Sequence, residues 1–205
     1  MINDIQHRMY TNVPNLVIGF HGCDKTVAEK VINGEAELDE SKNNYDWLGH
    51  GMYFWEQNLR RAWQWAENQR KVTTPAVIGA VIDLGYCLNL LDSRSMELLR
   101  EHYSLFVESC DALGKVLPQN RNIGKNTDLL LRDLDCAIIE DMHKLRDASP
   151  LPSFDSVRGV FIEGTELYQG SGFKDKSHIQ ICVRNPNCIK GFFLPRNANT
   201  QWSIP

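Results

Sequence analysis

The stretch LVIGFHGC, at residues 16–23, begins the part of the sequence that decides the fold. Its first five residues are an apolar run that favours a β-strand, and the run stops at His21 and Gly22. Asp24 can cap a following helix, whose apolar residues lie on one side and which ends at Gly34. Because Gly22 has no side chain, a ligand can approach the backbone there, and the His21 imidazole can hydrogen-bond a hydroxyl group. A satisfied histidine at a strand end is the plainer alternative.

A second stretch, LGHGMYFW at residues 48–55, places two glycines before a short strand at residues 51–54. The order is loop to strand and a third glycine is missing, so this is not the dinucleotide fingerprint of a Rossmann fold. What remains is a tight turn that presents Tyr53. A hydrophobic core patch is the alternative for the surrounding aromatic residues, and it explains Trp63 and Phe54.

Patterning along the rest of the chain predicts an α+β fold. Helices are expected at about residues 56–71, 95–113 and 127–145, with a loop at 117–124. The strongest strand is the β-branched run at residues 76–82, and three further strands are expected at 159–162, 179–183 and 189–194. Short connections predict that these late strands are antiparallel. The whole chain, residues 1–205, is expected to form one domain with a helical insertion at about 92–147.

Composition narrows the class of protein. The chain has 205 residues, a net charge of −4 and 42% hydrophobic residues, which suits a globular domain and argues against a generic polyanion binder. The six cysteines include no C-x-x-C pair, which predicts reduced thiols and no metal site. The N-terminus lacks the apolar core of a signal peptide, and no run approaches 18 apolar residues. We therefore expect a cytoplasmic protein with no membrane partner.

Together, His21-Gly22-Cys23 and the run from Gly49 to Phe54 resemble the ADP-ribosyltransferase superfamily. The resemblance is to the His-Tyr-Glu branch, which includes the poly(ADP-ribose) polymerases and diphtheria toxin. The order of the motifs, their separation and the intervening helix match over about residues 16–70. The resemblance implies a split, mixed or antiparallel β-sheet with flanking helices, and NAD as co-substrate.

The resemblance also implies roles for single residues. His21 would bind an NAD ribose hydroxyl, the Gly22 backbone would pair with the nicotinamide amide, and the Tyr53 ring would stack on the nicotinamide. Cleavage of the glycosidic bond creates a cationic ribose, which needs a negative or accepting group beside it. The other residues expected near the cofactor are Cys23, Gly51 and Arg60.

The third residue of the branch, a glutamate, is replaced in this sequence. The strand at residues 177–183 offers His178 or Gln180 instead, and Gln180 is preferred because it alternates inward between apolar neighbours. A glutamine can hydrogen-bond a ribose but cannot carry a charge. Family members without the glutamate tend to transfer a single ADP-ribose, and some are inactive.

The glycine-rich loop at residues 163–173 occupies the place of the family's target-recognition loop. It carries Glu163, Glu166 and Tyr168, and one of the carboxylates is a candidate for the missing charge. Residues 174–196 hold five Lys or Arg against one Asp, so a basic side facing NAD phosphates or a nucleic acid is an alternative to scattered surface charge.

The expected function is NAD-dependent mono-ADP-ribosyl transfer to a protein or nucleic acid, as in a bacterial toxin or phage-defence effector. A toxic transferase would be expected to have an inhibitory antitoxin partner. One alternative is a catalytically inactive module that binds NAD or ADP-ribose. Another is an RNA 2′-phosphotransferase-like enzyme, although the paired histidine-arginine signature of that family is not seen.

Overall fold

The structure is a computed structural model that describes residues 16–123 and 128–204. Seven strands form one sheet in the order β4-β7-β8-β2-β1-β3-β9, and two more form a separate ribbon, β5-β6. The sheet strands are β1 (Val17–Asp24), β2 (Met52–Glu56), β3 (Pro75–Ile82), β4 (Cys87–Asn89), β7 (Ser156–Phe161), β8 (His178–Val183) and β9 (Ile189–Phe193). All neighbouring pairs are antiparallel except β4–β7. The predicted α+β class, with a mostly antiparallel sheet, is confirmed.

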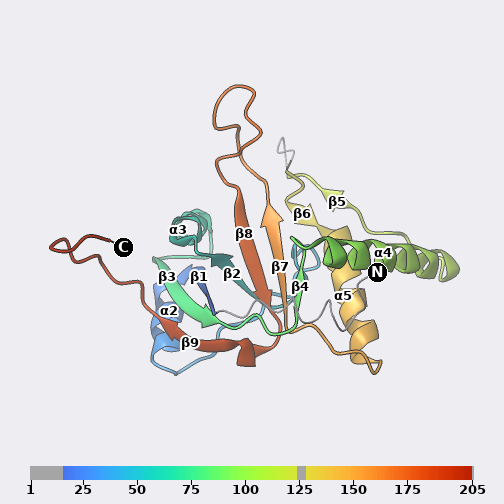
Figure 1. The fold of residues 1–205 in the computed structure, drawn as a ribbon, viewed down its shortest axis with the longest axis horizontal. Helices are drawn as coiled ribbons and strands as arrows, with labels where there is room; N and C mark the ends of the chain where they lie inside the picture. The colour runs from blue at the N-terminus through green and yellow to red at the C-terminus, as the bar shows by residue number, and fades with distance from the viewer. Residues whose placement is uncertain (1–15, 124–127, 205) are drawn as a thin grey trace.

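The helices lie at the two ends of this sheet (Figure 1). They are α2 (Lys25–Ile32), α3 (Leu59–Asn68), α4 (Ser93–Ala112) and α5 (Asp133–Asp147), with a short 3-10 helix at Pro186–Cys188. Helix α2 contributes to a core over β1, β3 and β9, and α3 to a small cluster with β2 and β3. Helix α5 packs on β4, β7 and β8. The insertion between β4 and β7 therefore supplies the second half of the core.

Gly22 brings α3 into direct contact with the sheet. A Cβ atom on Gly22 would lie 2.3 Å from the carbonyl oxygen of Ala62, so the helix backbone occupies the space that a side chain would fill. The small side chains of Ala62 and Ala66 are fully buried at this contact. Trp63, which was predicted to be part of the core, is 39% exposed because it lies on the outer side of α3.

Several predicted boundaries shift. Strand β1 continues to Asp24 because β3 pairs with its whole length, so His21 and Gly22 lie inside the strand rather than at its end. Asp24 still caps α2, through a bond from the Thr26 N–H. Helix α5 begins at Asp133 rather than at 127, after the ribbon strands β5 (Asn120–Arg121) and β6 (Leu131–Arg132). Part of the loop and helix predicted across residues 124–127 lies outside the described residues.

The last strand does not pair with the strand before it, although the connection between them is short. After β8 the chain turns through the 3-10 helix and β9 pairs with β3 on the other side of the sheet. The predicted antiparallel pairing holds for β7 and β8. None of the described helices has the length and apolarity needed to cross a bilayer.

Candidate functional site

The sheet order places the three predicted site segments next to one another. Strands β1, β2 and β8, which carry His21, Tyr53 and Gln180, are consecutive neighbours although they lie far apart in the sequence. Trp55 marks their junction, because it pairs with Phe20 on one side and with Gln180 on the other. Tyr53 and Gln180 therefore share the sheet face of Trp55, whereas His21 follows Phe20 and alternates to the other face, where its ring centroid lies 5.9 Å from that of Phe54.

His21 lies where β1 and β2 separate. The ladder between these strands has two pairs, Gly19 with Glu56 and Phe20 with Trp55. The His21 ring reaches the Tyr53 carbonyl, with Nδ1 2.8 Å from the oxygen. A carbonyl only accepts, so Nδ1 carries a proton, and burial lowers the pKa of His21 and favours the neutral ring. Its Nε2 therefore presents a lone pair that can accept a bond from a hydroxyl group.

The two residues after His21, Gly22 and Cys23, differ in what they can present to a ligand. Gly22 would lie opposite Tyr53 if the β1–β2 register continued, but the two are not paired in the ladder. Its backbone edge is therefore at the place where the strands part. Cys23 turns its side chain into the core with α2, and burial raises the pKa of its thiol to about 11. Only the backbone of Cys23 is available to a cofactor.

The hydroxyl group of Tyr53 is fully committed to the turn before β2. It donates to the Gly49 carbonyl at 2.6 Å and accepts from the Leu48 N–H at 2.9 Å. Burial raises the pKa of Tyr53 well above its usual value, so it does not serve as an acid or base near neutral pH. What Tyr53 can offer to a ligand is its partly buried ring.

Helix α5 holds this turn from the other side, through Glu140. The Glu140 carboxylate accepts the His50 N–H at 2.8 Å and lies 3.2 Å from His50 Nδ1. Gly49 has a φ of 78°, and a Cβ there would lie 2.7 Å from Glu140 Oε1, so the turn requires glycine for both conformation and space. Sequence analysis missed Glu140, because nothing in the insertion indicated that it contacts the glycine turn.

Glu140 also borders a cavity of about 330 Å³. The residues that line it are polar or charged for the most part: Glu40, His50, Glu140, Ser153, Phe154, Asp155, Arg184 and Asn185. The acid and amide groups of Asp155 and Asn185 are bonded to each other, and Arg184 bonds to the Phe154 carbonyl. These groups are used within the fold, so we assign no ligand to this cavity.

Glu140 predicts an acid-dependent loss of stability. Burial opposes its ionisation, but the nearby His143 ring, with Nδ1 3.7 Å from Oε1, and the bond from the His50 backbone outweigh this and lower its pKa to about 2, against an ordinary value of 4.5. The carboxylate therefore stabilises the fold above pH 4.5, and this contribution disappears as the pH falls from 4.5 through about 2. We expect Glu140→Gln to lower the free energy of unfolding by about 2–3 kcal/mol at pH 7 and by nearly nothing at pH 2. Urea denaturation across this range measures the difference, and a constant difference at all pH values would contradict the role.

The third position of the site holds no carboxylate on β8. Gln180 and His178 share the face of Trp55, and Gln180 lies between Trp55 and Gly159. The His178 side chain is 2% exposed and stacks on Phe161, with ring centroids 5.6 Å apart. Both candidates for the third position are thus present in the site, and neither carries a negative charge.

A carboxylate does enter the site from the loop. Glu163 Oε1 lies 2.7 Å from Arg61 Nη2 and 3.6 Å from His178 Nδ1, and the Arg61 and Glu163 side chains are only 14% and 13% exposed. The other loop candidates do not reach the site. Glu166 accepts the Gly170 N–H within the loop, and Tyr168 is 64% exposed.

Helix α3 contributes Arg61 rather than Arg60, which is exposed. Arg61 also bonds to Gln64 on the same helix, at 2.9 Å. The periodicity of α3 contained the signal that was missed, because the buried residues Ala62 and Ala66 fix which flank of the helix faces β8.

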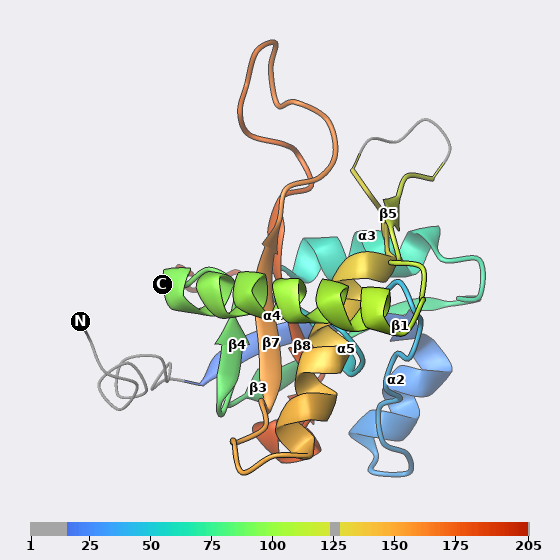
Figure 2. The same ribbon diagram turned by 90° about the vertical axis from the view of Figure 1, so that its right-hand side faces the viewer.

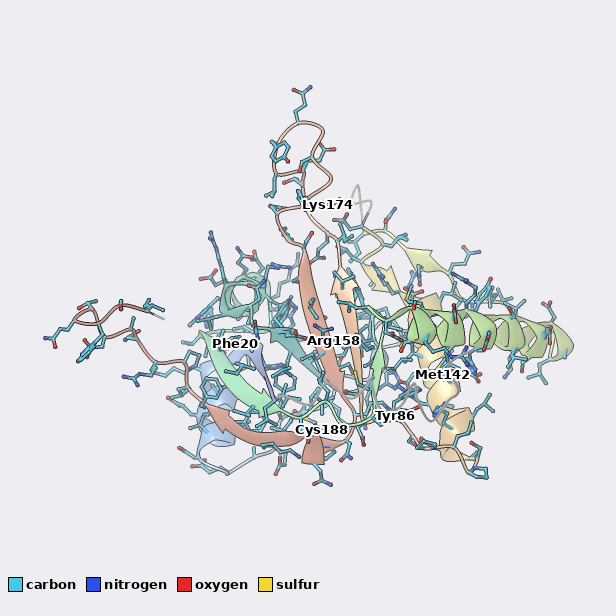
Figure 3. The ribbon with its side chains drawn as sticks, in the orientation of Figure 1. Phe20, Tyr86, Met142, Arg158, Lys174 and Cys188 are labelled. Carbon is cyan, nitrogen blue, oxygen red and sulfur yellow. The ribbon has the colours of Figure 1, made fainter. Side chains whose placement is uncertain are left out.

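The loop between β7 and β8 projects from the body of the molecule (Figures 1 and 2). Its base is tied to the insertion by Asp128, which accepts from Lys174 Nζ at 2.7 Å and from the Gly164 N–H at 2.9 Å. Figure 3 shows Lys174 at this base. The loop is therefore anchored on one side by Asp128 and on the other by Arg61.

Two further observations bear on cofactors. Among residues 16–123 and 128–204, no three His, Cys, Asp or Glu side chains are grouped so that they could hold a metal ion. All six cysteines are buried and unpaired. For NAD, the acceptor nitrogen of His21 and the ring of Tyr53 suit a ribose hydroxyl and a flat aromatic group.

Comparison with known proteins gives similarity without a function. No protein-family model matches the chain. It is similar to an uncharacterized protein of Methanocaldococcus jannaschii, with 29% identity over 193 residues that span 83% of this chain and 83% of the relative.

Proposed function

We propose that the protein is an NAD-dependent mono-ADP-ribosyltransferase that modifies a macromolecular acceptor, either a protein or a nucleic acid. The observation that carries this proposal is the adjacency of β1, β2 and β8. It places side by side the strands that carry His21, Tyr53 and Gln180, the three residues that match the family motif by resemblance, and His21 contacts the Tyr53 carbonyl.

The geometry of each group suits the role proposed for it. His21 accepts a hydrogen bond from a ribose hydroxyl at Nε2, because its Nδ1–H is held by the Tyr53 carbonyl. The Tyr53 ring stacks on the nicotinamide, since its hydroxyl is bonded into the turn. Gln180 orients the ribose, and Glu163 provides the negative charge that favours the cationic ribose.

Single transfer follows from the third position. Family members without the glutamate of this position tend to transfer a single ADP-ribose. The corresponding face of β8 carries Gln180 and His178. The only nearby carboxylate in the described part of the loop, Glu163, is bonded to Arg61.

NAD binding tests the role of His21. We expect His21→Ala to weaken the affinity for NAD about tenfold, because one hydrogen bond to the ribose is lost. Isothermal titration with NAD measures the change. A matched control is His102→Ala, since His102 is a histidine that is likewise hydrogen-bonded within the fold, to Asp141 at 3.0 Å, but lies between α4 and α5. Equal affinities in the two variants would contradict the assignment.

A second candidate is a catalytically inactive module that binds NAD or ADP-ribose. The absence of a carboxylate on the described strand β8 favours it. It predicts that NAD raises the melting temperature while no nicotinamide is released. Release of nicotinamide by the wild-type protein, lost in His21→Ala, would exclude this candidate.

The class of acceptor is open to a direct experiment. The protein is incubated with NAD labelled in the adenylate and with a cell extract, and the labelled material is treated with protease, RNase or DNase. Label that survives protease but is released by a nuclease identifies a nucleic acid acceptor, and the converse identifies a protein.

A further inference from the structure

His178 has an unusual environment for a histidine at the start of a strand. Its ring lies on Phe161 and beside Trp55, with ring centroids 6.3 Å apart in the second case. Nδ1 lies 2.6 Å from the Lys176 carbonyl and 3.6 Å from Glu163 Oε1. Both neighbours of Nδ1 are acceptors, so this nitrogen carries the proton.

The other nitrogen of the ring is therefore the basic one. Burial lowers the pKa of His178, although the Lys176 carbonyl and the Glu163 charge act in the opposite direction. The neutral ring with its proton on Nδ1 leaves a lone pair on Nε2. This atom is buried and has no hydrogen-bond partner among the described residues.

Two more buried groups without hydrogen-bond partners lie in the same cluster, Trp55 Nε1 and Arg61 Nε, and both are donors. Arg61 reaches His178 through Glu163, and Trp55 neighbours the His178 ring directly. Buried polar atoms are nearly always satisfied, so three exceptions in one cluster mark a place where a polar ligand is favoured. One acceptor and two donors are available to it.

We propose that His178 is the general base of the transferase and that Glu163 and the Lys176 carbonyl hold it in the required tautomer. This inference rests on the proposed function, and it assigns the third position to His178, with Gln180 as the ribose-binding neighbour two residues along the same face. It also restricts the acceptor to a group that must lose a proton, such as a hydroxyl.

The proposed step balances as follows. The bond between C1′ of the ribose and N1 of the nicotinamide breaks, and its electron pair leaves with nicotinamide. The acceptor oxygen forms a bond to C1′, and its proton passes to Nε2 of His178 and then to solvent. Water can take the place of the acceptor, in which case the product is free ADP-ribose.

Access to Nε2 requires a local movement. Because this atom is buried, an acceptor reaches it only after a neighbouring segment shifts, and we infer that this segment is the chain between β7 and β8, which leads into His178. The ion pair of Arg61 with Glu163 is the contact that such a shift breaks. The diphosphate of NAD is an alternative partner for the Arg61 guanidinium.

Two reactions of NAD, hydrolysis and nicotinamide exchange, distinguish the contribution of the base from the contribution of the rest of the site. Hydrolysis of NAD needs a base to take the proton of water. Exchange of labelled nicotinamide into NAD needs none, because the attacking ring nitrogen has no proton to lose. We expect His178→Gln to reduce the rate of hydrolysis by about 10²–10⁴-fold and to keep nicotinamide exchange within a fewfold of wild type. The matched control is His102→Gln, which should leave both rates unchanged.

Glu163→Gln adds a readout that a structural role would not change. The charged groups facing His178 are Glu163 from the loop, which raises its pKa, and Arg61 from α3, which lowers it. Without the Glu163 charge, the fall in the rate of hydrolysis on the acid side should move to lower pH. An unchanged pH profile would overturn the role of Glu163 as a positioning residue.

The possible outcomes distinguish a failure of the role proposed for His178 from a failure of the proposed transferase function. If His178→Gln loses exchange as severely as hydrolysis, or if it loses neither, His178 is not the base. Wild-type protein that exchanges nicotinamide but does not hydrolyse NAD would also overturn the base. If the wild type catalyses neither reaction, the proposed transferase function itself fails.

Discussion

Tyr53→Ala should reduce the release of nicotinamide from NAD at least ~100-fold, because the ring that holds the leaving group in position is lost. Tyr53→Phe keeps the ring and should retain most of the activity. The Tyr53→Phe variant should instead be less stable than the wild type. The two bonds that tie the hydroxyl to Leu48 and Gly49 are removed, which lowers the free energy of unfolding by about 1–3 kcal/mol.

The two Tyr53 variants together separate catalysis from folding. Nicotinamide release by chromatography measures the first, and urea denaturation measures the second. Tyr103→Ala is the matched control, since Tyr103 lies on α4 and is 38% exposed. If Tyr53→Ala remains folded and turns over NAD at the wild-type rate, the stacking role is wrong. If Tyr53→Phe is as inactive as Tyr53→Ala, the hydroxyl and not the ring is essential.

Arg158→Met should lower the free energy of unfolding by about 3–5 kcal/mol, because it leaves the Glu56 carboxylate largely buried without its partner. Arg158 lies on β7, next to the edge strand β4 (Figure 3), and bonds Glu56 with both Nε, at 2.5 Å, and Nη2, at 2.8 Å. The two side chains are only 16% and 12% exposed. Screening by solvent is therefore weak at this pair.

The double variant Arg158→Met/Glu56→Leu tests whether the loss comes from the unpaired charge. We expect it to recover most of the stability, since two apolar side chains replace two charges that need each other. Urea denaturation of both single variants and of the double variant measures the coupling. Arg100→Met, at an exposed position on α4, serves as the control and should change stability by less than about 0.5 kcal/mol. A double variant as unstable as Arg158→Met would show that packing, and not charge, is responsible.

Local patterning was sufficient for most elements of the fold. The β-branched run of β3 and the cap at Asp24 are signals that act within a few residues, and both were predicted. Strand β4 has three residues and β5 and β6 have two each, too few for a period to be visible. The position of β9 beside β3 depends on which edge of the sheet is free, and no local pattern contains that information.

The site likewise contains residues that local patterning predicts and residues that it does not. His21 and Tyr53 lie in sequence motifs, and their neighbours in the turn follow from the glycine spacing. Glu140 and Glu163 act through the insertion and through the loop, at separations of 90 and 102 residues from the groups that they bond. The sequence around a carboxylate does not indicate which distant residue the carboxylate will bond. The tautomers of His21 and His178 could be inferred only after the carbonyl groups facing them were located.

The order of the strands sets when in biosynthesis the protein becomes complete. The two motifs in the first third of the chain wait for β8, at residues 178–183, which is the strand that lies between β2 and β7. A ribosome-bound chain that has not yet released this segment holds His21 and Tyr53 but neither His178 nor Gln180. If the protein is the transferase proposed above, the growing chain stays inactive until β8 has emerged and paired with β2.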